Sequence, residues 1–305
     1  MEIWYGFPQA REKKEKVVLT IGFYDGIHQG HQKIIEKLKK EAELLGGKSA
    51  LVTFDPSSFS YLFHHPLPLL TTWEEKKEIL EKAGIELIIL LSFTRRIASL
   101  SPYSFIKKLN QGLKIKKIIV GEDFVFGKDR EGNIFWLKEK ESELGYKLEV
   151  VPLLKKEGRK ISSSLLRTWL SEGKIEEVTR WLNRSPTLIG KVIRGEGRGY
   201  SLGYPTANIK PHRAKLLPIS GVYAGRVFIG KKIYKGIVNI GEKPTFGDKS
   251  FGVEVHIINF QKNIYGKNLK IELIKKIREI EKFPSSFCLV KRIEKDKRRV
   301  EELLG

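Results

Sequence analysis

The sequence predicts an α/β domain with a doubly wound parallel sheet, followed by a smaller antiparallel β domain that ends in a helix. Three observations carry this prediction. The length of 305 residues suits two domains of roughly 150 residues each. The first half alternates β-branched strand patterns with helical patterns, which is typical of a parallel sheet. The second half has short strand patterns separated by Gly, Pro and Asn, which favours a small barrel or sandwich.

In the first half, expected strands end at turn signals and helices follow them. An apolar strand at residues 17–23 ends before Asp25-Gly26, and residues 29–45 have helical spacing. Thr72-Trp73-Glu74-Glu75 is a capping box that starts a helix reaching Gly84. Further strands are expected at residues 49–54, 87–91, 117–120 and 147–151.

The pattern changes at Asn183-Arg184-Ser185-Pro186. We therefore expect two domains, at residues 1–184 and 185–305. Helices at residues 163–170 and 175–182 precede this boundary, and a polar helix at residues 290–304 closes the chain. The strands after the boundary are expected at residues 188–193, 222–229, 235–240, 253–259 and 269–274.

The composition limits the classes of function. Lys and Arg total 57 against 36 acidic residues, so the formal net charge is +21. That charge suits either a nucleic-acid binder or a basic surface for anionic substrates such as nucleotides. The basic residues are interspersed with Glu, which favours the second class and predicts no nucleic-acid partner.

The same composition predicts a cytoplasmic protein without a membrane partner. No apolar run approaches the ~20 residues of a bilayer span, and the first residues lack a signal-peptide pattern. The one cysteine, Cys288, allows no internal disulfide. The sequence leaves the oligomeric state open.

Ligands of doubly wound sheets bind at the carboxyl ends of the strands, so we expect function in the loops after Phe23, Phe54 and Val120. The loop after Phe23 is glycine-rich, and the N–H groups of the helix that follows attract phosphate. His28 and His31 can both donate hydrogen bonds to a phosphate whose charge grows during a reaction. Capping or surface histidines and a metal pair are the alternatives.

The segment His28-Gln29-Gly30-His31 resembles a signature of nucleotidyltransferases, which transfer a nucleoside monophosphate from a triphosphate. A second signature of that superfamily, Ile-Ser-Ser-x-x-x-Arg, is matched by Ile161 to Arg167. Hydroxyls at a helix start with an arginine one turn later can clamp a triphosphate, although a serine cluster alone is usually an N-cap. The resemblance implies His28 and His31 as the catalytic pair and a nucleotide site of Gly22, Asp25, Gly30, Ser162, Ser163, Ser164 and Arg167.

Two further stretches narrow the subfamily. Residues 120–128 and Thr53-Phe54-Asp55-Pro56 resemble the branch of these enzymes that adenylylates flavins. This likeness implies that Phe54, Asp123 and Phe126 bind the flavin substrate.

A second site is indicated by Pro205-Thr206-Ala207-Asn208, which follows a glycine-rich stretch. The hydroxyl of Thr206 and the amide oxygen of Asn208 lie two residues apart after a proline-fixed turn, and both can ligate Mg²⁺. Glu254 lies within an alternating strand pattern, where a carboxylate either has a task or faces solvent.

Together these residues resemble the riboflavin kinase domain, a six-stranded β-barrel. The resemblance implies that Thr206 and Asn208 bind Mg²⁺-ATP, that Glu254 is the catalytic base and that Arg278 contacts substrate. Two positions depart from the bacterial pattern, Tyr200 where Arg is frequent and Ile280 where an acid is frequent.

The two resemblances, in this order, indicate the bacterial bifunctional riboflavin kinase/FAD synthetase family. They imply that riboflavin is phosphorylated to FMN and that FMN is then adenylylated, with ATP as co-substrate and Mg²⁺ as cofactor, to give FAD and pyrophosphate. Two alternatives were weighed: a nucleotidyltransferase for another phosphorylated acceptor, with a second domain that only binds, and a basic nucleic-acid-binding protein.

Overall fold

The computed structural model describes residues 1–10, 14–56, 58, 68–156, 158–195, 199, 202–242 and 251–305. The backbone divides into two units. The first contains Met1–Leu69 and Lys76–Ser163, and the second contains Leu70–Glu75 and Ser164–Gly305. A short segment from the first half of the sequence therefore packs with the second half. The functional boundary after residue 184 stays a prediction.

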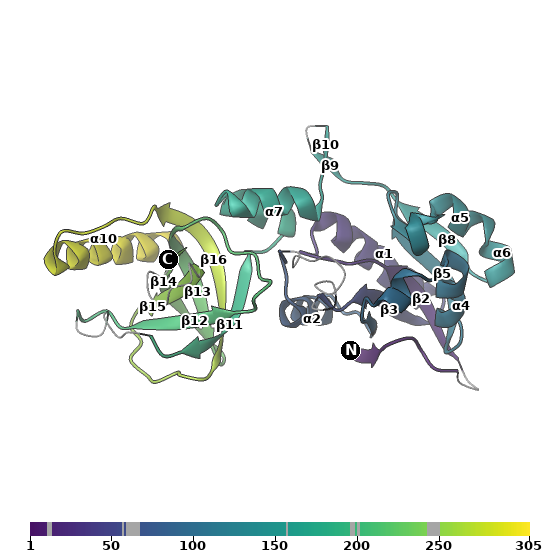
Figure 1. Ribbon diagram of the computed structural model, residues 1–305, viewed down its shortest axis with the longest axis horizontal. Helices are drawn as coiled ribbons and strands as arrows, with labels where there is room; N and C mark the ends of the chain where they lie inside the picture. Colours follow the sequence, from purple (N-terminus) through teal and green to yellow (C-terminus); the bar gives the residue numbers. More distant parts are fainter. Residues whose placement is uncertain are drawn as a thin grey trace. The chain divides into compact units, whose positions relative to one another are not determined.

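The first unit is built on a six-stranded sheet in which neighbouring strands are parallel (Figure 1). Its strand order is β1-β4-β3-β2-β5-β8. Strand β4 is buried along its whole length, as expected for a parallel strand covered on both faces. The strands are β1 Glu2–Tyr5, β2 Glu15–Ile21, β3 Lys48–Phe54, β4 Leu87–Leu91, β5 Leu113–Gly121 and β8 Lys147–Val151.

Helices cover both faces of this sheet, so the predicted doubly wound architecture is confirmed. Val17 and Leu19 of β2 share one apolar core with Phe105 of helix α4. Residues between them point to the opposite face, and helix α1 packs on β2, β3 and β5. The helices are α1 Gln29–Leu44, α2 Trp73–Lys82, α3 Arg95–Ala98, α4 Pro102–Leu109, α5 Ile134–Glu139 and α6 Glu141–Leu144.

The strand order reverses beside β2, and this reversal positions a site. From β2 the chain moves to β3 and β4 on one side, and then returns to add β5 on the other side. In open α/β sheets, ligands bind at the carboxyl ends of the strands where the order reverses, which here are the loops that follow β2 and β5. Two short ribbons lie outside the sheet: β6 Val125–Phe126 with β7 Gly132–Asn133, and β9 Lys155–Lys156 with β10 Arg159–Lys160; a 3₁₀ turn, η2, spans Lys128–Arg130.

The second unit contains a closed barrel in the order β11-β12-β15-β14-β13-β16, with every pairing antiparallel. Alternate residues of its strands, such as Val253 and Val255, fill the barrel core. The predicted antiparallel β-barrel is confirmed. The strands are β11 Thr187–Ile193, β12 Thr206–Pro211, β13 Gly221–Ile229, β14 Lys232–Glu242, β15 Phe251–Ile257 and β16 Asn268–Arg278.

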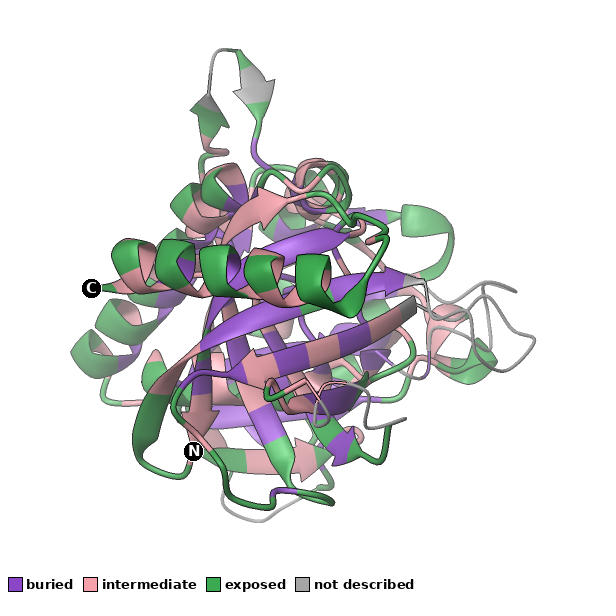
Figure 2. Ribbon diagram, turned by 90° about the vertical axis from the view of Figure 1, so that its left-hand side faces the viewer, coloured by how far each residue is buried: buried purple, intermediate pink, exposed green. Residues whose placement is uncertain are grey.

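Three helices belong to this unit: α7 Ser163–Ser171 (from Ser164), α8 Ile175–Leu182 and the C-terminal α10 Ser286–Leu304. Helix α10 lies against β13 and β14 and exposes its other face (Figure 2). Val300 anchors it in a small core with Val222 and Ile237 on the outer face of the barrel. Through this core, one end of α10 covers part of the outer face of the barrel.

Two strands of the main sheet and the barrel were not predicted, for different reasons. Strand β12 contains Thr206 and Asn208, which follow the turn at Pro205, and no strand was expected there. Thr206–Pro211 forms a strand because it pairs with β11 and β15, and β15 is distant in sequence. Strand β1 is a short edge strand without a buried residue, so it lacks the apolar pattern that indicates a strand.

A buried ion pair ties the segment Leu70–Glu75 to the barrel. Lys215 Nζ lies 2.6 Å from Glu75 Oε2 and 2.7 Å from the carbonyl oxygen of Leu70, and both charged side chains are at most 3% exposed. Glu75 also accepts from Ile189 N at 3.1 Å and from Thr72 N at 3.0 Å, which completes the predicted capping box. Both oxygens of the carboxylate therefore accept hydrogen bonds.

We expect Lys215→Met to lower the free energy of unfolding by about 3 kcal/mol, because it leaves the Glu75 carboxylate buried without its cation. Urea unfolding monitored by circular dichroism measures the loss. The double variant with Glu75→Gln should recover part of this loss, because no buried charge remains, although the single amide oxygen can accept from only one of Thr72 and Ile189, which bond different oxygens of Glu75. Equal stability of the single and double variants would show that charge burial is not the cause.

Candidate active sites

The loop between β2 and α1 has an unusual backbone. Tyr24 and Ile27 have positive φ angles of 51° and 43°, and Gly26 between them has a φ of 78°. Such angles are costly for residues with a side chain and are held only by surrounding structure. A Cβ at Gly22 would lie 2.9 Å from the Tyr24 ring, so this glycine is needed for packing.

The loop delivers His28 and His31 to the start of α1. Their rings stack with centroids 3.8 Å apart and an interplanar angle of 17°. The Tyr24 ring lies 4.8 Å from that of His31, and its hydroxyl is 2.6 Å from Thr20 Oγ1. Burial raises the pKa of Tyr24, so it stays neutral.

The alternatives for His28 and His31 are capping residues, surface residues and a metal pair. His28 occupies the N-cap position of α1, but its side chain makes no capping hydrogen bond. A Cβ on Gly30 would lie 3.1 Å from the His28 ring, so Gly30 gives that ring room. Among the described residues, no group of three or more His, Cys, Asp and Glu side chains could hold a metal ion. The capping interpretation of His28 is wrong.

The second predicted signature, Ile161 to Arg167, contacts the loop that precedes His28. Ser163 Oγ donates a 2.9 Å hydrogen bond to the carbonyl oxygen of Asp25, which is 138 residues away in the chain. Asp25 itself is 1% exposed. Ser162 belongs to the same unit, whereas Ser164 and Arg167 belong to the second unit, so their part in this site stays a prediction.

The predicted flavin contacts follow β3 and β5. Asp123 lies in the loop after β5 and pairs with Lys160 of β10. Phe126 packs in an aromatic cluster with Phe124, Phe105 and Trp136. Phe54 ends β3 and meets the Phe93 ring edge-on at 5.2 Å. These residues surround the carboxyl end of the sheet, and their role in binding flavin stays a prediction.

In the barrel, Glu254 lies between two asparagines. Strand pairing puts it opposite Asn208 of β12 on one side and opposite Asn239 of β14 on the other. Residues in register point to the same face of a sheet. A Cβ on Gly195 would lie 1.9 Å from the Asn208 side chain, so the backbone there passes directly over Asn208. The barrel thus holds a carboxylate flanked by two amides.

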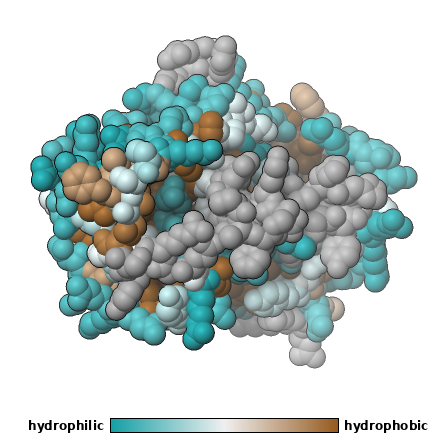
Figure 3. Space-filling view, turned by 60° about the vertical axis from the view of Figure 1, so that its left-hand side comes forward, coloured by the Kyte–Doolittle hydropathy of each residue, from teal (hydrophilic) through white to brown (hydrophobic). Residues whose placement is uncertain are grey.

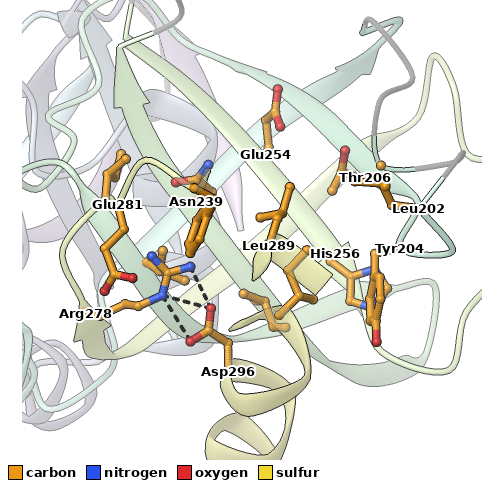
Figure 4. A pocket seen from close by; sticks show the side chains of 16 residues that line it. Leu202, Tyr204, Thr206, Asn239, Glu254, His256, Arg278, Glu281, Leu289 and Asp296 are labelled. Atoms are coloured by element: carbon orange, nitrogen blue, oxygen red, sulfur yellow. Dashed lines mark hydrogen bonds and ion pairs between the residues drawn. The ribbon is translucent and has the colours of Figure 1, made fainter. Parts of the chain in front are cut away.

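Glu254 borders a cavity of about 290 Å³ between the barrel and α10. Its wall combines polar Thr206, Asn239 and Glu254 with apolar Leu289 and Ile293 of α10. Figure 4 shows Glu254, Asn239 and Thr206 toward the top of the view. Apolar side chains border a hollow in the molecular surface of Figure 3. The cavity suits a flat ligand with one polar arm.

A larger cavity of about 660 Å³ lies on the other side of Thr206. Pro205, Phe260 and Tyr265 form part of its wall. Thr206 is the side chain that both cavities share among their lining residues. Two ligands would therefore meet at Thr206, close to Glu254.

His256 stabilises the backbone at this junction. Its Nδ1 lies 2.9 Å from the Pro205 carbonyl oxygen, and its ring meets that of Tyr204 at 5.3 Å. Burial lowers the pKa of His256, so the ring is neutral and Nδ1–H is the donor to that carbonyl. The Tyr204 hydroxyl in turn lies 3.5 Å from Glu294 of α10.

Arg278 lies in the cavity wall, but its guanidinium is directed to Asp296 of α10. Arg278 Nε and Nη2 lie 2.9 and 2.7 Å from Asp296 Oδ2, as the dashed lines in Figure 4 show. The side chains are 11% and 6% exposed. Ile280 also borders this cavity, whereas Tyr200 lies outside the described residues.

Comparison with known proteins identifies the family. Residues 10–165 match the family model for FAD synthetase, and residues 182–304 match that for riboflavin kinase. The bifunctional riboflavin kinase/FMN adenylyltransferase of Bacillus subtilis is 36% identical over 94% of this chain and 92% of its own. That of Haemophilus influenzae is 33% identical over 97% of both chains. The chain belongs to the bifunctional riboflavin kinase/FMN adenylyltransferase family.

A solved structure agrees in fold with this family member over its whole length. A protein from Streptococcus pneumoniae, described as a macrolide-efflux protein, is 27% identical and covers 98% of both chains with a TM-score of 0.87. Among the residues that the structure describes, we find no helix whose length and hydropathy would let it span a bilayer.

Sequence reasoning missed three residues. Asn239 and Asp296 line the barrel cavity. Lys76 of α2 donates a hydrogen bond to the carbonyl oxygen of Phe23 in the loop between β2 and α1. Asn239 had a usable signal, because an amide within a β-branched strand is as unexpected as Glu254. Asp296 and Lys76 gave none, since each lies on a helix rich in charged residues. Their burial, 5% and 0% exposed, depends on partners far away in the sequence.

Asp296→Asn should loosen helix α10. An amide keeps a hydrogen-bond acceptor but loses the charge, which costs about 1.5–3 kcal/mol. If α10 opens locally, its amides should exchange with deuterium about 10- to 100-fold faster, as measured by mass spectrometry. Arg298→Gln, at an exposed position on the same helix, is the matched control. Unchanged exchange in Asp296→Asn would show that the pair with Arg278 does not hold α10.

Proposed function

We propose that this chain makes FAD in two steps at two separate sites, phosphorylating riboflavin in the barrel and adenylylating the resulting FMN at the parallel sheet. The main support is the position of Glu254, which lies between two asparagines and beside Thr206, where two cavities meet. A domain that only bound a flavin would have no use for a carboxylate at that junction. This argues against the alternative of a binding-only second domain.

In the kinase reaction, riboflavin occupies the smaller cavity and ATP the larger. Leu289 and Ile293 cover the apolar flavin ring, and Glu254 faces its 5′-hydroxyl. Glu254 takes the hydroxyl proton as the oxygen attacks the γ-phosphate, whose bond to the β-phosphate oxygen breaks and releases ADP. Asn239, in register with Glu254, orients the carboxylate.

The donor set beside Glu254 fits Mg²⁺. Thr206 and Asn208 supply a hydroxyl and an amide oxygen from the same side of β12, and both are hard oxygen ligands. We assign the metal to these two residues, where it would neutralise charge on the ATP phosphates. The close backbone at Gly195 holds the Asn208 side chain in place.

In the second reaction, an oxygen of the FMN phosphate attacks the α-phosphate of a second ATP. The bond from that phosphorus to the bridging oxygen breaks, and pyrophosphate leaves. His28 and His31 donate hydrogen bonds to the charge that develops on the α-phosphate, supported by the N-terminus of α1. Ser162 and Ser163 hold the triphosphate, with backbone contacts from Gly22, Asp25 and Gly30, whereas Ser164 and Arg167 are assigned to it from the signature alone. Phe54, Asp123 and Phe126 contact the flavin.

The remaining proposals concern surroundings and partners. ATP carries phosphates in both reactions, and the flavin carries one when FMN is the substrate. These anionic ligands account for the net charge of +21 without a nucleic-acid partner. We therefore propose small-molecule partners, with no nucleic acid and no membrane. The exposed thiol of Cys288 suits a reducing compartment, in keeping with a cytoplasmic location.

The direct test incubates the protein with riboflavin, ATP and Mg²⁺ and separates the flavins by chromatography. FMN should form first and FAD should follow. A supply of FMN should give FAD and pyrophosphate without riboflavin. If FMN is left unchanged while a phosphorylated acceptor without a flavin is adenylylated, the flavin assignment of the first site is wrong.

His28→Ala or His31→Ala should slow FMN adenylylation by about 10²–10³-fold, the usual loss for one preorganised donor. The rate of FAD formation from FMN is the measurement. Riboflavin phosphorylation by the same preparation is the control and should be unchanged. Equal loss of both activities would show that the histidines are needed only for folding.

Glu254→Gln keeps the size of the side chain but removes the proton acceptor. Riboflavin phosphorylation should fall by about 10²–10⁴-fold. FAD formation from supplied FMN should continue at the normal rate, and Mg²⁺-ATP should still bind the barrel. A variant that phosphorylates riboflavin normally would make Glu254 a surface strand residue.

A further inference from the structure

Lys76 of helix α2 is a fully buried lysine in the first unit. Its side chain is 0% exposed. Nζ donates a 2.6 Å hydrogen bond to the carbonyl oxygen of Phe23 and lies 3.4 Å from Thr53 Oγ1. The ammonium also lies 4.7 Å from the centre of the Phe23 ring. Lysines are almost never buried to this degree without a partner that needs their charge.

The Phe23 carbonyl is the first acceptor of the loop that leads to His28. Thr53 Oγ1 donates to the same oxygen at 3.1 Å. Directly after it come the positive φ angles of Tyr24, Gly26 and Ile27. Two of these residues carry side chains, so this backbone costs of order 1–3 kcal/mol each unless it is held from outside. Lys76 and Thr53 hold it from the side of β3 and α2.

Two carboxylates act on the Lys76 ammonium, one from each neighbouring loop. Asp25 belongs to the loop after β2, and Asp55 directly follows β3. Burial lowers the pKa of Lys76 to about 8, and the attraction of Asp25 and Asp55 opposes this shift. Lys76 is therefore a cation at neutral pH and loses its proton in mildly alkaline solution.

We propose that Lys76 is a positioning residue of the adenylylation site, whose buried positive charge holds the loop from Phe23 to Ile27 in the conformation that presents His28 and His31. The proposal rests on the adenylylation proposed for this site. It predicts that adenylylation depends on the protonation of Lys76, although Lys76 does not touch the reacting atoms.

The pH dependence separates this role from a purely structural one. The pKa of Lys76 is lower in the folded protein than in the unfolded chain, where it is about 10.4. Between these two values the unfolded chain binds more protons, so the Lys76 contribution to stability rises with pH. The positioning role has the opposite sign, because adenylylation should fall as the folded protein loses the proton at a pH of about 8.

The experiment uses the whole chain and three variants. Lys76→Met removes the charge at similar length, Lys76→Arg keeps it, and Lys77→Met changes an exposed lysine on the same helix. FMN adenylylation and riboflavin phosphorylation are measured from pH 6.5 to 9.5. We expect Lys76→Met to reduce kcat for adenylylation about 10- to 100-fold and to abolish the fall in rate at alkaline pH. Lys76→Arg should shift that fall to higher pH, and Lys77→Met should behave as the unchanged chain.

Several outcomes would overturn the proposal. One is a Lys76→Met variant that keeps the adenylylation rate or keeps the alkaline fall. Another is equal loss of phosphorylation. A flat adenylylation profile of the unchanged chain across this pH range would also overturn it, and this measurement needs no variant to fold.

A second readout is independent of activity. The ring proton resonances of His28 and His31, assigned from their Ala variants, should shift with a midpoint near pH 8 in the unchanged chain and in Lys77→Met but not in Lys76→Met. If the unchanged chain makes no FAD from FMN, the proposed function fails, and the resonances still test Lys76. Histidine shifts that are identical with and without Lys76 would exclude the positioning role.

Discussion

Glu254 is held in register with Asn208 and Asn239 by the backbone hydrogen bonds of β15 to its two neighbours. A slip of one residue at either pairing would turn Glu254 into the barrel core and bring Val253 or Val255 to the outer face. The apolar alternation of the strand prevents this, because the core would then have to accept a carboxylate. The packing of the barrel and the placement of the proposed kinase base thus have a single cause.

In the first unit, strand pairing also fixes where the site begins, here in a parallel sheet. Strand β2 pairs with β3 and β5, so the loop that carries His28 must start between the ends of two neighbours. The ladder stops at Ile21, and beyond it side chains take over the support of the backbone. Thr53, Lys76 and Ser163 each bond a carbonyl oxygen of that loop. Side chains from β3, α2 and α7 therefore hold the strained backbone of this loop.

Much of this arrangement could be predicted from the sequence, where local signals are strong. The apolar run Leu87–Leu91 and the helical spacing of Ile175–Leu182 coincide with the observed elements. The capping box at Thr72 is formed as predicted. Glu254 could be singled out because a carboxylate in a β-branched strand contradicts the local preference.

The rest depends on partners that no local pattern contains. Strand β12 has no clear strand pattern of its own, and its pairing with β11 and β15 makes it a strand. Lys76 and the exposed Lys77 are each flanked by one glutamate and one lysine in the sequence. Only the packing of the loop after β2 makes Lys76 a buried cation while Lys77 stays in solvent. Asp296 is distinguished from its charged neighbours by its hydrogen bonds to Arg278, which lies 18 residues away.

The segment Leu70–Glu75 has a consequence for dividing the protein into parts. A gene fragment cut at the composition change, beginning at residue 185, would encode Lys215 without Glu75. Its barrel would expose the backbone of Ile189 and leave an ammonium in an apolar wall with no carboxylate to receive it. The complementary fragment would carry Glu75 without its lysine partner. The two catalytic halves are adjacent in the sequence, but the compact units are interleaved, and a free-standing kinase made from this chain would need Leu70–Glu75 as well as residues 164–184.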